Sequence, residues 1–143
     1  MPAPFRILFV STGNSCRSQM AEAWVRHLAP AHVVARSAGT RPRHLHPLAT
    51  RVMQEAGVDI SAQRGKAVAP LVHERFELVV TLCETAAAEC PPLPLATRRV
   101  HQPFDDPALL VVDPEDEDID AYRALRDEIR ACVAAILEGE VGR

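Results

Sequence analysis

The sequence predicts an α/β fold in which helices cover both faces of a parallel β-sheet. Short apolar runs of strand length alternate along the chain with segments whose apolar residues recur at helical spacing. One run, 76–82 (FELVVTL), is largely apolar, as expected of a strand that is buried on both sides. Because right-handed crossovers leave few topologies for such a sheet, we expect ligand-binding residues at the carboxyl ends of its strands.

The N-terminal half is predicted to form two strands and two helices. A strand over 5–10 (FRILFV) is followed by an amphipathic helix. A second strand over 32–36 (HVVAR) leads into a turn over 37–40. An apolar stripe at helical spacing predicts a second helix over 49–56, and Gly57 is in place as its C-terminal stop.

The C-terminal half is predicted to add two strands and two helices. The buried strand is followed by an alanine-rich helix over 84–89 and by a last strand over 98–101. Prolines and paired aspartates then force a loop over 101–107. The stretch 111–120 holds six carboxylates and is expected to project into solvent ahead of the final helix. The core stripe of that helix consists of Tyr122, Leu125, Ile129, Val133 and Ile136.

The composition indicates one ordinary globular domain spanning residues 1–143. The chain is 48% hydrophobic and 24% charged, and its length suffices for one core. A formal net charge of -3 gives no reason to expect a nucleic-acid partner. The sequence contains neither an apolar run of membrane-spanning length nor the pattern of a signal peptide. We therefore expect a monomer in the cytoplasm, without a membrane partner.

The loop over 11–17, between the first strand and the first helix, has the features of an anion site. Gly13 allows the backbone to close tightly, and Asn14 tolerates left-handed geometry, so that successive amides can converge beside a helix N-terminus. Arg17 adds a fork of donors suited to two oxygens of a tetrahedral oxyanion. The expected oxyanion-binding residues are Ser11, Thr12, Gly13, Asn14, Ser15, Cys16 and Arg17. The loop therefore predicts a phosphate-like ligand.

The stretch 12–22 (TGNSCRSQMAE) resembles the thioredoxin-coupled arsenate reductases of the low-molecular-weight tyrosine phosphatase superfamily. The resemblance extends over nearly the whole chain and implies a flavodoxin-like three-layer fold with a four-stranded parallel sheet. In that family the first loop residue is a nucleophilic cysteine, whereas this chain has Ser11. A thiol at this position becomes a thiolate, but an alcohol needs a neighbouring base, and the loop contains no histidine. We therefore expect the loop to bind an oxyanion without reacting.

The segment 83–91 (CETAAAECP) resembles the redox segment of the same reductases. The resemblance implies a relay in which arsenate forms an adduct at position 11, Cys83 attacks to release arsenite, and Cys90 resolves the disulfide, which thioredoxin then reduces. It also implies that Ser18 hydrogen-bonds the nucleophile and that Asp106 protonates the leaving oxygen. The expected partners are arsenate, with phosphate and sulfate as competing anions, and thioredoxin as the external reductant. No bound cofactor is expected.

Each of these residues also has a simpler structural interpretation. Ser18 is suited to capping the first helix, and Asp106 to capping a turn. Cys83 and Cys90 are small enough to pack a short helix. Cys16 is interpreted as a small, partly buried side chain rather than as a replacement nucleophile, because the attacking atom belongs at the start of the loop.

The resemblance also implies the remnant of a potassium site behind the loop. Asn14, Glu22 and Ser37 match ligand positions of the ion that some members hold, but the aligned acidic ligand is replaced by Lys66. An ammonium supplies the positive charge itself. We therefore expect no requirement for a monovalent cation and no other metal, the alternative being that Lys66 is a solvated surface residue.

The spacing of Cys83 and Cys90 predicts a redox switch rather than a permanent disulfide. In an intact helix the two residues lie roughly 10 Å apart along the axis. A disulfide requires Cα atoms within about 6.8 Å, so that oxidation must unwind the segment. Its alanines, and the prolines just beyond it, indicate a helix with a firm stop and few anchoring side chains.

Three functions are compatible with these features. The first is an arsenate reductase whose sequence is altered at residue 11 so that the reaction stops. The second is a low-molecular-weight tyrosine phosphatase, in which Cys83 and Cys90 would have no role and only one Tyr and one Trp could frame an aromatic substrate. The third is a natural oxyanion-binding protein without turnover. We favour the first, because a lineage that had lost catalysis would have little reason to keep Arg17, Asp106 and both cysteines together.

Overall fold

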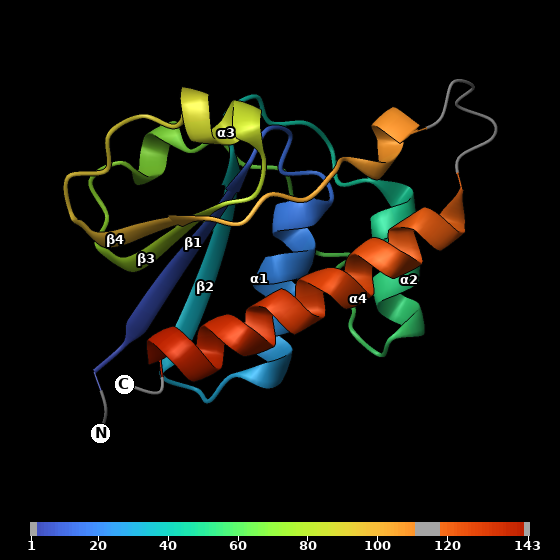
Figure 1. Cartoon of the computed structure of the whole chain (residues 1–143), viewed down its shortest axis with the longest axis horizontal. Helices are drawn as coiled ribbons and strands as arrows, with labels where there is room; N and C mark the ends of the chain where they lie inside the picture. Colours follow the sequence, from blue (N-terminus) through green and yellow to red (C-terminus); the bar gives the residue numbers. More distant parts are fainter. Residues whose placement is uncertain (1–2, 111–117, 142–143) are drawn as a thin grey trace.

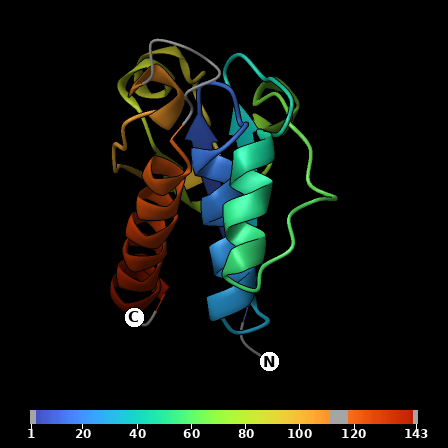
Figure 2. The same ribbon diagram turned by 90° about the vertical axis from the view of Figure 1, so that its right-hand side faces the viewer.

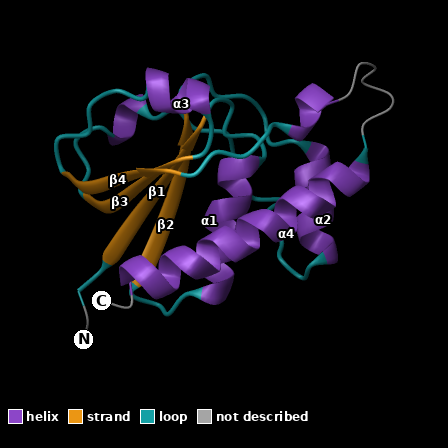
Figure 3. Ribbon diagram, in the orientation of Figure 1, coloured by secondary structure: helices purple, strands orange, loops and turns teal. Residues whose placement is uncertain are grey.

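A computed structural model describes residues 3–110 and 118–141 as a four-stranded parallel sheet with helices on both faces (Figures 1 and 3). The predicted α/β fold is confirmed. The helices and strands are β1 (Phe5–Ser11), α1 (Arg17–Leu28), β2 (Val33–Gly39), α2 (Pro47–Glu55), β3 (Phe76–Thr81), α3 (Glu84–Glu89), β4 (Ala96–His101) and α4 (Ile119–Ile136). Short helical turns are η1 (Ala69–Leu71), η2 (Pro107–Leu110) and η4 (Leu137–Val141).

The strand order β2-β1-β3-β4 places β1 in the interior of the sheet, hydrogen-bonded to both β2 and β3. All three pairings are parallel, so the carboxyl ends of the four strands lie at one edge. Figure 2 shows α1, α2 and α4 side by side on one face of the sheet, while α3 lies on the other. The loop that follows β1 is therefore at the centre of the edge where ligands bind in such folds.

The second strand is longer than the sequence pattern predicted, and the turn predicted over 37–40 is wrong. Ser37, Ala38 and Gly39 continue β2 and pair with the last three residues of β1. A Cβ atom added to Gly39 would lie 2.7 Å from the carbonyl oxygen of Thr12, closer than real Cβ contacts allow. The small residues there reflect close packing against the loop rather than a change of chain direction.

The final helix packs as its apolar stripe predicted. Tyr122 and Ile129 are each 1% exposed, and they contact the buried residues of α1 and α2. The indole Nε1 of Trp24 in α1 donates to the carbonyl oxygen of Arg126 in α4, at 3.1 Å. Residues 111–117 of the acidic stretch lie outside the described residues, so the expectation that they project into solvent is not tested. Within the described ranges, the structure has no helix long and apolar enough to cross a membrane.

Candidate active site

Several of the sequence-predicted site residues line an open cavity of about 740 Å³ at the carboxyl edge of the sheet. Its lining includes Thr12 of the loop after β1, Cys83 after β3, and Asp106 in the segment after β4, together with Arg17. Ser11 is 2% exposed at the end of β1, directly beside the cavity lining. Cys90 is half-buried at the opposite end of α3 and does not line the cavity.

Asn14 holds the loop in shape. It has a φ of 50° and is the single residue other than glycine with positive φ in the described part of the chain, as its tolerance of left-handed geometry predicted. Its side-chain oxygen accepts from the backbone amide of Lys66 at 2.9 Å and from Nε2 of Gln19 at 3.0 Å. Because a backbone amide can only donate, this contact fixes the orientation of the side-chain amide and turns Nδ2 toward Ser18.

The hydroxyl groups of Ser11 and Ser18 are part of the same network. Nδ2 of Asn14 donates to Oγ of Ser18 at 2.7 Å, and Oγ of Ser18 shares a hydrogen bond of 2.6 Å with Oγ of Ser11. Oγ of Ser11 also accepts from the backbone amide of Asn14 at 3.1 Å. The side-chain atom at position 11 therefore accepts from one backbone amide and shares a hydrogen bond with one hydroxyl group. A donated hydrogen bond stabilises negative charge on that atom, and neither the amide nor the hydroxyl group is a base.

The segment 40–46 lies along the back of the loop, a feature that the sequence analysis missed. Its backbone amides bind the carbonyl oxygens of the loop at N···O distances of 2.8 to 3.1 Å. The four pairs are Thr40 with Ser11, Arg41 with Thr12, Arg43 with Gly13, and His46 with Ser15. These four hydrogen bonds engage carbonyl oxygens of the loop and hold its backbone against the segment 40–46.

Arg17 and Asp106 meet at the mouth of the cavity. Nη1 of Arg17 donates to the carbonyl oxygen of Phe104 at 3.0 Å, and Nη2 lies 3.6 Å from Oδ2 of Asp106. The other carboxylate oxygen of Asp106 accepts from the backbone amide of Ala108 at 3.0 Å. The carboxyl group thus caps a turn, as its simpler interpretation predicted, and at the same time faces the cavity.

The two cysteines of the redox segment lie at the two ends of α3, where they are its N-cap and C-cap residues. The thiol of Cys83 is buried and lies 3.1 Å from Oγ1 of Thr12, next to the loop. Cys90 is not bonded to Cys83, and burial raises the pKa of its thiol while Arg99 partly opposes this rise. Burial therefore disfavours the thiolate form of Cys90 in this structure.

The expectation that α3 has few anchoring side chains is wrong. Glu89 accepts from Oγ1 of Thr40 at 3.2 Å and pairs with the guanidinium group of Arg41. At the other end, Oε1 of Glu84 lies 3.1 Å from Nε2 of His101. Both acidic residues of the helix therefore contact neighbouring segments. One of these is the segment 40–46, which is also hydrogen-bonded to the loop.

Lys66 lies beside the matched ligand positions behind the loop. Its ammonium group is 3.9 Å from Oε1 of Glu22, and the same oxygen accepts from Oγ of Ser37 at 3.2 Å. Burial lowers the pKa of Lys66, and the charge of Glu22 opposes the change. The side chain is therefore a partly buried partner of Glu22 and not simply a solvated surface residue.

The chain is a parallel α/β protein with a tight loop after β1, and the buried Arg17 completes that loop. Comparison with known proteins gives the family. The model of the low molecular weight phosphotyrosine protein phosphatases matches residues 6–142, and the chain belongs to that family.

Relatives of the chain within this family include arsenate reductases. That of Bacillus licheniformis is 44% identical over 124 residues, covering 86% of this chain and 88% of the relative. The solved structure of an arsenate reductase in the phosphate binding state is 25% identical, with a TM-score of 0.77 and coverage of 94% of this chain and 97% of that chain. A thioredoxin-dependent arsenate reductase from Corynebacterium glutamicum is 26% identical, with a TM-score of 0.70, covering 99% of this chain and 64% of that one.

Proposed function

We propose that this chain is an arsenate reductase in which Ser11 permits arsenate binding and prevents turnover. The observation that carries the proposal is the position of the Cys83 thiol, 3.1 Å from Thr12 in the same loop as residue 11. A phosphatase has no use for a second thiol at that place. The relatives named arsenate reductase, at 38–44% identity, support the same activity.

In this proposal the oxyanion is held by the loop amides and by Arg17. The helix N-terminus and the guanidinium group favour a dianion, and the two arginine nitrogens match two of its oxygens. Asp106 lies 3.6 Å from Nη2 of Arg17, and it protonates the oxygen that leaves arsenic. The protein acts as a monomer, and residues 1–143 form one domain.

With a cysteine at position 11, the relay balances with two electrons supplied by Cys83 and Cys90. The thiolate at position 11 replaces one hydroxyl group of arsenate, which leaves as water after protonation by Asp106. Attack of the Cys83 thiolate on the sulfur at position 11 forms a disulfide and reduces arsenic(V) to arsenite. Cys90 then attacks the sulfur of Cys83, which frees the thiolate at position 11 and leaves a Cys83–Cys90 disulfide.

An external dithiol must return the disulfide to the reduced state, and we assign this role to thioredoxin. The thioredoxin-dependent arsenate reductase of Corynebacterium glutamicum supports this assignment, and the reaction takes place in the cytoplasm, where thiols are kept reduced. Ser11 stops the sequence at its first step, because its Oγ is hydrogen-bonded to the Asn14 amide and to the Ser18 hydroxyl group, and neither of these is a base.

The Ser11→Cys variant should reduce arsenate in the presence of thioredoxin, thioredoxin reductase and NADPH. The chain with Ser11, called the unaltered chain below, should show no rate above background. Loss of a nucleophile costs on the order of 10⁶-fold in a well-studied serine protease, so residual activity is not expected. The measurement is arsenate-dependent oxidation of NADPH. The matched control is Ser11→Cys with Cys83→Ser, which should form the adduct and fail to turn over. Hydrolysis of a phosphate monoester by Ser11→Cys without arsenate reduction would instead favour the phosphatase.

The unaltered chain should keep Cys83 and Cys90 reduced in the presence of arsenate and join them only with an added oxidant such as diamide. Bridging should remove the amide protection of residues 84–89, because the two ends of an intact α3 are too far apart for a disulfide. Peptide mass spectrometry and hydrogen exchange measure the two effects. Arg41→Ala, which removes the ion pair to Glu89, should speed the bridging. A bridge that forms with amide protection intact would contradict the account.

The melting temperature of the unaltered chain should be the same in potassium and sodium salts at equal ionic strength. The ammonium group of Lys66 lies 3.9 Å from Oε1 of Glu22 and offsets the charge of that carboxylate. In this proposal, it takes the place of a bound potassium ion. Lys66→Asp restores an acidic group at that position and should give a melting temperature that rises with potassium. A potassium response in the unaltered chain, or none in Lys66→Asp, would show that Lys66 does not replace an ion.

A further inference from the structure

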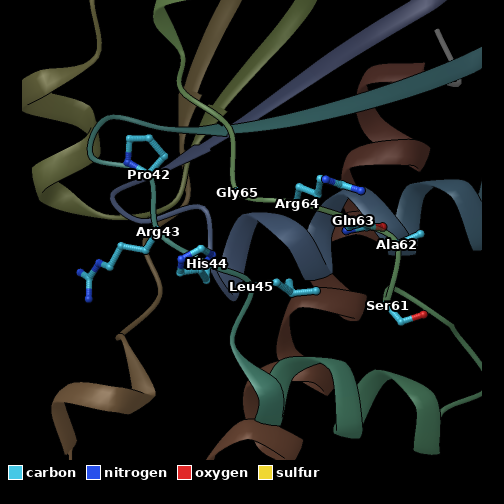
Figure 4. Close-up of a pocket in the computed structure, with 9 residues that line it drawn as sticks. All are labelled: Pro42, Arg43, His44, Leu45, Ser61, Ala62, Gln63, Arg64 and Gly65. Carbon is cyan, nitrogen blue, oxygen red and sulfur yellow. The ribbon is translucent and has the colours of Figure 1, made fainter.

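Arg43 is a second arginine at the mouth of the cavity, and the sequence analysis assigned it no role. It lines the cavity that holds Arg17 and Cys83, and it also borders a larger open groove of about 1160 Å³ between segments 42–45 and 61–65. Figure 4 shows the groove, with the Arg43 side chain directed away from Arg64 on the opposite side. Arg43 therefore stands between the groove and the candidate active site.

The backbone of Arg43 is fixed against the loop from two sides. Its amide donates to the carbonyl oxygen of Gly13 at 2.8 Å. On the other side, a Cβ atom added to Gly65 would lie 1.8 Å from the Arg43 carbonyl oxygen, so only glycine fits there. A Cβ atom added to Gly13 would lie 3.2 Å from Nε of Arg43, which places the side chain directly over the loop. The backbone of Arg43 is therefore fixed beside the loop, and its exposed side chain extends over Gly13.

The carboxylates around the cavity oppose an entering anion, and a second cation would offset their charge. Arg17 donates to Phe104 and faces Asp106, and the lining also includes the acidic side chains of Glu84, Asp105 and Glu128. A dianion that enters is therefore opposed by several carboxylates. Among the described residues, no carboxylate lies within ion-pair distance of Arg43, in contrast to Arg41, which is bound to Glu89.

We propose that Arg43 binds the oxyanion from the mouth of the cavity and so makes the site selective for charged arsenate over neutral arsenite. The inference rests on the proposed function, which supplies the anion. Arsenate carries one or two negative charges near neutral pH, whereas arsenite is uncharged. An arginine at the entrance strengthens binding of the substrate and gives no comparable hold on the product, which favours product release. Arg43 is thus a substrate-binding residue that acts together with Arg17.

The unaltered chain allows a direct test, because Ser11 lets an anion bind without reaction. Titration calorimetry with inorganic phosphate and with arsenate should give dissociation constants roughly tenfold weaker for Arg43→Ala, as loss of a charge-assisted hydrogen bond predicts. Arg43→Lys should bind more tightly than Arg43→Ala because the positive charge remains. It should bind more weakly than the unaltered chain because lysine lacks the paired N–H donors of the guanidinium group. The matched control is Arg64→Ala, which removes an equally exposed arginine from the other side of the groove and should change the constants less than about twofold.

Each outcome decides between the two proposals. Equal binding by the unaltered chain and Arg43→Ala contradicts the role of Arg43 and leaves the proposed function intact. Equal weakening by Arg43→Ala and Arg64→Ala shows an effect of net charge alone and also contradicts it. Failure of the unaltered chain to bind either anion contradicts the proposed function, and the role of Arg43 with it. Unchanged melting temperatures of the variants show that the loop itself stays folded.

Discussion

The oxyanion loop depends on one buried residue, Asn14, which adopts a positive φ of 50° and links three segments of the chain. Its side-chain oxygen accepts a hydrogen bond from the backbone amide of Lys66, and its side-chain nitrogen donates to Oγ of Ser18. Left-handed backbone geometry costs about 1–2 kcal/mol for most residues, and the short polar side chain of asparagine offsets that cost with local hydrogen bonds. The backbone nest, the serine pair and the Lys66 segment are therefore parts of one arrangement.

In the proposed function, the identity of residue 11 decides whether a bound oxyanion reacts. The amide of Asn14 donates to the side chain at that position, and the hydroxyl of Ser18 shares a hydrogen bond with it. In the proposed function, a thiol at this position is held as a thiolate. A hydroxyl group has an ordinary pKa far above that of a thiol, so the same two hydrogen bonds cannot make it a nucleophile. In this proposal, the framework around Ser11 is suited to a reaction that Ser11 itself cannot begin.

The sequence predicted the features that depend on local pattern. Strand and helix order followed from apolar periodicity, and the left-handed geometry of Asn14 followed from its residue type. The continuation of β2 through Gly39 was missed, because it depends on pairing with β1 and on close packing against Thr12. The anchoring of α3 was missed because the partner of Glu89 is 48 positions away in the sequence. Arg43 was passed over because an arginine in a loop has no periodicity that marks its position.

The most direct test of this account is the crystal structure of the unaltered chain at saturating arsenate. The account predicts a tetrahedral anion on the backbone amides of residues 12–17, bound by the guanidinium group of Arg17 and in contact with Oγ of Ser11, with the Cys83 thiol close by. Asn14 should keep its positive φ in that complex. An empty loop at saturating arsenate, or an anion bound only in the groove beside Arg64, would contradict the central claim that this loop is an intact oxyanion site lacking only its nucleophile.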